Sequence, residues 1–171
     1  ASSVPLTDAL LAALPGQLDV ALAVHGGSKV HTFTDFERDA SKLRDQAARV
    51  RCVAGGTRLL DILDRVLRTE GVSTVVYVGD VFEESEDKAR DIAASLATRK
   101  IRLIILHDTP SPSPTGIFAE ISSVTGGCVL PFNASALPRL RDLQREAEVT
   151  LHRQRAAEWL QPLPGPPCRK T

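Results

Sequence analysis

Two oxygen-bearing side chains, Thr57 and Asp80, are spaced along the sequence so that one cation could bind both. Thr57 follows the glycine pair Gly55 and Gly56 in "AGGT", and Asp80 follows the apolar run "VVYVG", which predicts a buried strand. One predicted helix and one predicted strand separate Thr57 from Asp80, a length of chain that returns to the same edge of a parallel sheet. A hard divalent cation such as Mg²⁺ prefers oxygen ligands, and this hydroxyl and carboxylate supply two of them.

Both residues also have simpler structural interpretations. Asp80 directly after a strand is a good N-cap for the following helix, and Thr57 can cap the helix that it precedes. The acids just beyond Asp80 are typical of a solvated first helical turn, where they face the positive end of the helix dipole. These acids are Glu83, Glu84, Glu86 and Asp87. From these residues alone, a metal site and a pair of helix caps both remain open.

Asp108 and His25 are outer candidates for the same edge, because each lies at or just after the end of a predicted strand. Asp80 and Asp108 could form a carboxylate pair, so a small α/β hydrolase or a phosphotransfer protein is the alternative function. No G-x-S-x-G nucleophile elbow is present, although His25 begins an "HGG" like that of some esterases. The sequence also contains no glycine-rich nucleotide-binding motif.

The composition indicates a globular chain with no bulk charge to attract polyanions. The 171 residues carry 21 Lys and Arg against 21 Asp and Glu, which argues against binding to nucleic acid or to an anionic membrane. No apolar run reaches the roughly 20 residues of a membrane helix, and the N-terminus has no signal-peptide pattern. Three widely spaced cysteines outside any metal-binding motif are typical of reduced thiols. We therefore expect a cytoplasmic protein.

Hydrophobic periodicity predicts an α/β fold: a doubly wound, mostly parallel sheet with one antiparallel edge hairpin and helices on both faces. Continuous apolar runs alternate with amphipathic segments, as in strands joined by helical crossovers. We expect one domain over residues 1–148, followed by the end of the last helix and a proline-rich tail over residues 149–171. The predicted strands span residues 18–26, 29–33, 72–79, 101–108 and 128–132, and the predicted helices span residues 6–14, 35–50, 58–71, 85–100, 116–127 and 134–160.

The order of these segments resembles that of a von Willebrand factor type A (VWA) domain, in particular its bacterial stand-alone members. The segments that carry the resemblance lie between about residues 18 and 145: "VALAVHGGSKVHTF", "AGGTRLLDILDRVL", "TVVYVGDVFEE", "IRLIILHD" and "IFAEISSVTGGCVLPF". In that family a metal-ion-dependent adhesion site binds Mg²⁺ or Mn²⁺ through three segments. The resemblance implies that Thr57 belongs to the second segment and Asp80 to the third.

The first of the three segments, D-x-S-x-S after the family's first strand, has no match in this sequence. Residues 1–17 contain only a predicted helix, and Ser2 and Ser3 lack the aspartate and the preceding strand. Three interpretations remain open: the segment lies upstream of these residues, it has been lost, or another segment replaces it. The site formed by Thr57 and Asp80 is partial, with water supplying the remaining ligands. A sheet without that central strand should expose apolar surface, which favours homo-oligomers or the addition of a partner's strand.

The resemblance implies a protein-interaction module without enzymatic activity. A partner protein would complete the coordination of the cation with an acidic side chain, so that binding would depend on the cation. A third interpretation takes the last predicted helix as a docking or oligomerisation helix, because one of its faces repeats at helical spacing. This face consists of Leu137, Leu140, Gln144, Ala147 and Leu151. The same face could instead pack on the sheet.

Overall fold

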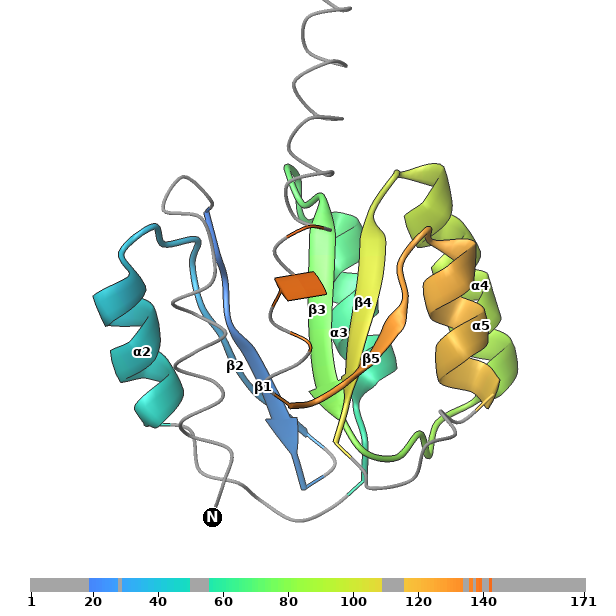
Figure 1. Ribbon diagram of the computed structural model, residues 1–171, viewed down its shortest axis with the longest axis horizontal. Helices are drawn as coiled ribbons and strands as arrows, with labels where there is room; N and C mark the ends of the chain where they lie inside the picture. The colour runs from blue at the N-terminus through green and yellow to red at the C-terminus, as the bar shows by residue number, and fades with distance from the viewer. Residues whose placement is uncertain are drawn as a thin grey trace, which may run out of the picture.

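The computed structural model describes most of the chain between residues 19 and 133 (Figure 1). Gly55, the helix predicted over residues 6–14 and the five positions of the docking helix lie outside the described residues, as does the domain boundary after residue 148. The described residues are 19–27, 29–49, 56–108 and 116–133, together with 136, 138, 139 and 142.

The described elements alternate in the order that the hydrophobic pattern predicts, and the α/β fold class is confirmed. None of the helices within the described ranges is long and apolar enough to cross a membrane. The strands are β1 (Ala23–Gly26), β2 (Lys29–Phe33), β3 (Thr74–Gly79), β4 (Arg102–His107) and β5 (Val129–Pro131). The helices are α2 (Ala40–Ala48), α3 (Leu59–Arg68), α4 (Glu86–Thr98) and α5 (Gly116–Val124).

Strands β1 and β2 form the predicted antiparallel hairpin. Gly27, in the turn between them, has a φ of 55°, a left-handed conformation that glycine adopts without steric cost. The first strand is shorter than predicted, since it begins at Ala23, and its pairing register shifts between Val24 and His25. An isolated antiparallel bridge between Val20 and Glu37 continues the pairing of the two arms beyond the strands themselves.

Strands β3, β4 and β5 form a parallel sheet in that order. The register pairs Thr74 with Arg102 at the start of β3 and Gly79 with His107 at its end. The chain reverses through α4 and α5 between these strands, so β3, β4 and β5 all end at one edge, which lies at the bottom of Figure 1. The residues that follow β3 and β4 therefore leave the sheet side by side.

The main hydrophobic core lies between this sheet and helices α3, α4 and α5. Leu59 and Leu63 from α3, Leu96 from α4 and Phe118 from α5 are fully buried in it. Burying each such side chain stabilises the fold by roughly 1.5–3 kcal/mol. The other face of the sheet has a smaller apolar cluster. There Ile104 and Leu106 of β4 pack with Ala136, a helical residue in the region of the last predicted helix.

The described strands form two sheets rather than one, because no described strand joins β1 to β3 by hydrogen bonds. The hairpin instead packs on the core through side chains. The Arg65 guanidinium of α3 lies 4.2 Å from the centre of the Phe33 ring, a cation–π contact. Val78 and Val81, at the end of β3, are among the exposed large apolar side chains. Whether they support oligomers or strand addition stays a prediction.

Helix α2 begins at Ala40, later than the predicted start at residue 35. The Asp39 side chain caps it by accepting a hydrogen bond from the Ser41 N–H (2.8 Å). Upstream, the Glu37 carboxylate accepts from the N–H groups of Arg38 (2.9 Å) and Asp39 (3.1 Å). These local bonds satisfy the backbone in a turn, which competes with helix formation at polar residues.

Candidate functional site

The structure places Thr57 next to the loop that carries Asp80. The Thr57 hydroxyl donates to the backbone carbonyl of Val81, the residue after Asp80, with an Oγ1–O distance of 3.3 Å. Asp80 itself follows β3 directly and is exposed. Gly56, just before Thr57, is half-buried. The hydroxyl and the carboxylate thus come from two loops at the carboxyl edge of the sheet, as the spacing predicts.

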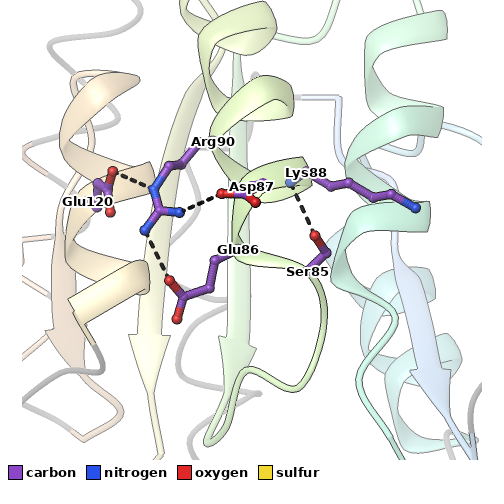
Figure 2. Close-up of polar contacts among 6 residues, drawn as sticks. All are labelled: Ser85, Glu86, Asp87, Lys88, Arg90 and Glu120. Carbon is purple, nitrogen blue, oxygen red and sulfur yellow. Dashed lines mark hydrogen bonds and ion pairs between the residues drawn. The ribbon is translucent and has the colours of Figure 1, made fainter.

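Neither residue is a helix cap, so the simpler interpretations of both are wrong. The N-cap of α4 is Ser85, whose hydroxyl accepts from the Lys88 N–H at 3.4 Å (Figure 2). The N-cap position of α3 is Arg58, which makes no side-chain capping bond. Thr57 directs its hydroxyl proton to the neighbouring loop instead of to the helix that it precedes.

Glu84 caps α3 from a distance in the sequence. Its carboxylate accepts hydrogen bonds from the backbone N–H groups of Leu59 (2.7 Å) and Leu60 (3.2 and 3.3 Å to its two oxygens). Burial raises the pKa of the Glu84 carboxyl, more than these N–H groups lower it. The predicted role of Glu84 as a solvated residue of a helix start is therefore wrong.

Arg90 holds three further acids of this region. Its guanidinium on α4 contacts Glu120 of α5 (2.8 Å) and, within α4, Glu86 (3.0 Å) and Asp87 (3.1 Å), as Figure 2 shows. Arg90 holds the pKa of the Glu120 carboxyl below its usual value through this hydrogen bond. All three carboxylates are thus ion-paired with Arg90, and the pair with Glu120 joins α4 to α5.

Gly79, which precedes Asp80, is required by the side chain of Tyr77. The two residues lie on the same face of β3, and a Cβ atom at Gly79 would collide with the hydroxyl and the ring of Tyr77. Tyr77 cannot move aside easily, because it is buried against Phe118 with a ring-centre distance of 5.8 Å. The glycine lets the aromatic ring lie along the strand up to the edge where Asp80 begins the loop.

His107, the last residue of β4, orients the backbone of Asp80. Its Nε2 atom lies 2.9 Å from the Asp80 carbonyl oxygen, and its ring packs edge-on against Phe118. The Asp108 N–H donates to the Gly79 carbonyl at 2.9 Å, which continues the strand pairing to the edge. Asp80 and Asp108 therefore follow neighbouring strands. No hydrogen bond or ion pair joins their side chains within the part of the chain that the structure describes.

His25, from the hairpin, meets the sheet rather than the Asp80 loop. Its ring stacks on Tyr77 with a centre distance of 5.7 Å and an interplanar angle of 13°. Its Nδ1 atom is buried and has no hydrogen-bond partner among the residues that the structure describes. Burial lowers the pKa of the His25 imidazole, because a protonated ring would hold an unpaired N–H donor away from water. His25 thus joins the hairpin to the parallel sheet through Tyr77, and its role at the candidate edge stays a prediction.

The lowered pKa of His25 predicts a dependence of stability on pH. The unfolded chain binds this proton more readily than the folded one, so stability is fully present above the ordinary pKa of 6.5. It is lost as the pH falls below 6.5 toward the lower folded pKa. We expect His25→Phe, which keeps a stacked ring, to flatten this loss in urea unfolding between about pH 7.5 and pH 5.

The exposed histidine of the same hairpin serves as the control for this measurement. His31→Gln, on β2, should leave the pH dependence of the wild type in place. An equal loss of unfolding free energy in His25→Phe and in the wild type would contradict the assignment to His25.

No group of three or more His, Cys, Asp and Glu side chains that could hold a metal ion occurs among the residues that the structure describes. The candidate site consists of Thr57 and Asp80, with Asp108 at the neighbouring strand end. Glu84 and His107 were not predicted as contributors to it. One sequence signal could have indicated the role of Glu84. The N-cap position of α3 is Arg58, whose side chain cannot accept a hydrogen bond, so an acid from another segment could cap this helix.

Comparison with known proteins supports the fold. One similar solved structure is the crystal structure of the conserved hypothetical protein BatB from Bacteroides thetaiotaomicron, with a TM-score of 0.66 over 85% of this chain and 86% of that one. The shared property is the fold. The two sequences are 14% identical, which is too low to assign the role of any residue of this chain from BatB. In sequence, no protein-family model and no curated protein matches this chain.

Proposed function

We propose that the chain is a VWA-type protein-interaction module that binds its partner through a divalent cation at Thr57 and Asp80. The observation that carries the proposal is the Thr57–Val81 hydrogen bond, which holds the hydroxyl beside the Asp80 loop. The order of the elements and the fold shared with BatB support the proposed family. Two of the segments that resemble a VWA domain contain the proposed ligands: "AGGTRLLDILDRVL" contains Thr57, and "TVVYVGDVFEE" contains Asp80.

The donor set suits Mg²⁺ or Mn²⁺ in an open site. Thr57 and Asp80 supply hard oxygen ligands, and the Thr57 oxygen keeps lone pairs while its proton is donated to Val81. Two protein ligands leave most of an octahedral shell to water, so an acidic side chain of a partner protein could enter it. In this proposal the bare site binds the ion weakly, and the partner strengthens binding.

Calorimetric titration with Mg²⁺ and Mn²⁺ tests the proposal. We expect the wild type to bind one ion weakly. The cation concentration should therefore reach on the order of 10 mM, which is above the dissociation constants of weak protein cation sites. Asp80→Ala should abolish the response, because Asp80 is the charged one of the two proposed ligands. Asp35→Ala, an exposed acid between β2 and α2, should bind like the wild type. A wild type without any cation response would refute cation-dependent binding by this chain.

The enzyme alternative, with Asp80 and Asp108 as a carboxylate pair, gains no specific support. Their backbones follow paired strands, but no hydrogen bond or ion pair joins their side chains within the described ranges. A homo-oligomer and a docking role for the last helix stay predictions. Size-exclusion chromatography of the full chain at several protein concentrations measures its oligomeric state.

A further inference from the structure

Glu84 joins the two loops that carry the proposed ligands. Its carboxylate lies on the first N–H groups of α3, those of Leu59 and Leu60. Thr57 leads into that helix, and Asp80 begins the loop from which Glu84 extends. Together with the Thr57–Val81 bond, these contacts fasten the β3–α4 loop to the start of α3. The position of Asp80 relative to Thr57 therefore depends on this fastening.

The start of α3 is electrostatically unfavourable for a nearby cation. The unpaired N–H groups of a first helical turn carry the positive end of the helix dipole, roughly half an elementary charge. Arg58, at the N-cap position, adds a full positive charge and offers no capping acceptor. Its contact with Asp61, at 3.8 Å, is between exposed side chains and is screened by solvent. Glu84 is half-buried and lies directly on the N–H groups.

We infer that Glu84 is a positioning residue for the cation site of Thr57 and Asp80, and that its charge also offsets the positive end of α3. The charge role of Glu84 rests on the proposed function, because it presupposes a cation at Thr57 and Asp80. The fastening of the loop to the helix is a property of the protein without any cation. The two roles are separable, because glutamine at position 84 keeps a hydrogen-bond acceptor but has no charge.

Mn²⁺ titrations at low ionic strength test the charge role, with Glu84→Gln compared to Glu83→Gln. Glu83 is the exposed neighbour in the same loop, so both variants lose one negative charge from one segment. We expect Glu84→Gln to weaken Mn²⁺ binding about fivefold to tenfold, as for a lost charge at a partly buried helix end. Glu83→Gln should change it less than about twofold, because an exposed charge is screened. Equal effects of the two variants would overturn the charge role.

Amide hydrogen exchange at Leu59 and Leu60 tests the fastening in metal-free protein. We expect these amides to exchange about tenfold faster in Glu84→Ala than in Glu83→Ala, because a charged acceptor is lost. Equal rates in the two variants would overturn the fastening. If the wild type binds neither Mn²⁺ nor Mg²⁺, the proposed function fails and the charge role fails with it. The exchange rates still decide the fastening by themselves.

Discussion

Gly127→Ala should destabilise the protein by about 3 kcal/mol or more, a loss at the severe end for a single substitution. An added Cβ would collide with the backbone carbonyl of Leu103, in β4, and backbone cannot rotate away as a side chain can. Other bonds fix the turn after α5 to this strand and to the end of the helix. The Leu103 N–H donates to the Thr125 hydroxyl (2.9 Å), and the Gly127 N–H donates to the Ser122 carbonyl (2.8 Å).

Urea denaturation of the purified variants measures this effect, and Gly116→Ala is the matched control. Gly116 is the first residue of α5, and a Cβ there would meet no other described part of the chain within 4 Å, its chain neighbours and its own helix backbone aside. The alanine should be neutral or stabilise by up to about 1 kcal/mol, because it restricts the unfolded chain. A Gly127→Ala protein as stable as the wild type would show that the turn can shift away from β4.

Phe118→Ala should cost about 3–5 kcal/mol of unfolding free energy, the range for a large aromatic residue removed from a core. The Phe118 ring is fully buried and contacts the rings of Tyr77, Phe82 and His107, each at 5.8 Å between centres. The cavity would lie beneath the edge of the sheet. Because His107 contacts the Asp80 carbonyl, a loosened His107 should also loosen the Asp80 loop.

Two comparisons separate the packing role of Phe118 from a general loss of aromatic surface. Phe36→Ala removes a phenylalanine that is 46% exposed, and it should cost less than about 1 kcal/mol. Phe118→Leu keeps most of the volume and should cost less than about 1.5 kcal/mol. Thermal and urea unfolding give the energies, and amide exchange at residues 80–84 reports on the loop. Similar energies for Phe36→Ala and Phe118→Ala would contradict the core assignment.

The strands and helices of this fold could largely be predicted from the sequence. The run "LIIL" within "IRLIILHD" is continuously apolar because both faces of a parallel sheet are covered. Helix α3 was equally clear, since its apolar residues repeat at helical spacing and all but Leu67 are buried. The start of α2 was not predictable from periodicity, because side-chain bonds from Glu37 and Asp39 decide where the helix begins.

The sequence by itself determined the order of the elements and the return of Thr57 and Asp80 to one edge of the sheet. Both follow from local periodicity and from the handedness of strand–helix–strand connections. The tertiary structure alone decided that Glu84 lies on the start of α3 and that His107 contacts the Asp80 backbone. Such contacts depend on how loops distant in sequence meet, and no short-range pattern encodes that. For the same reason Asp80 looked like a helix cap until the structure showed Ser85 in that position.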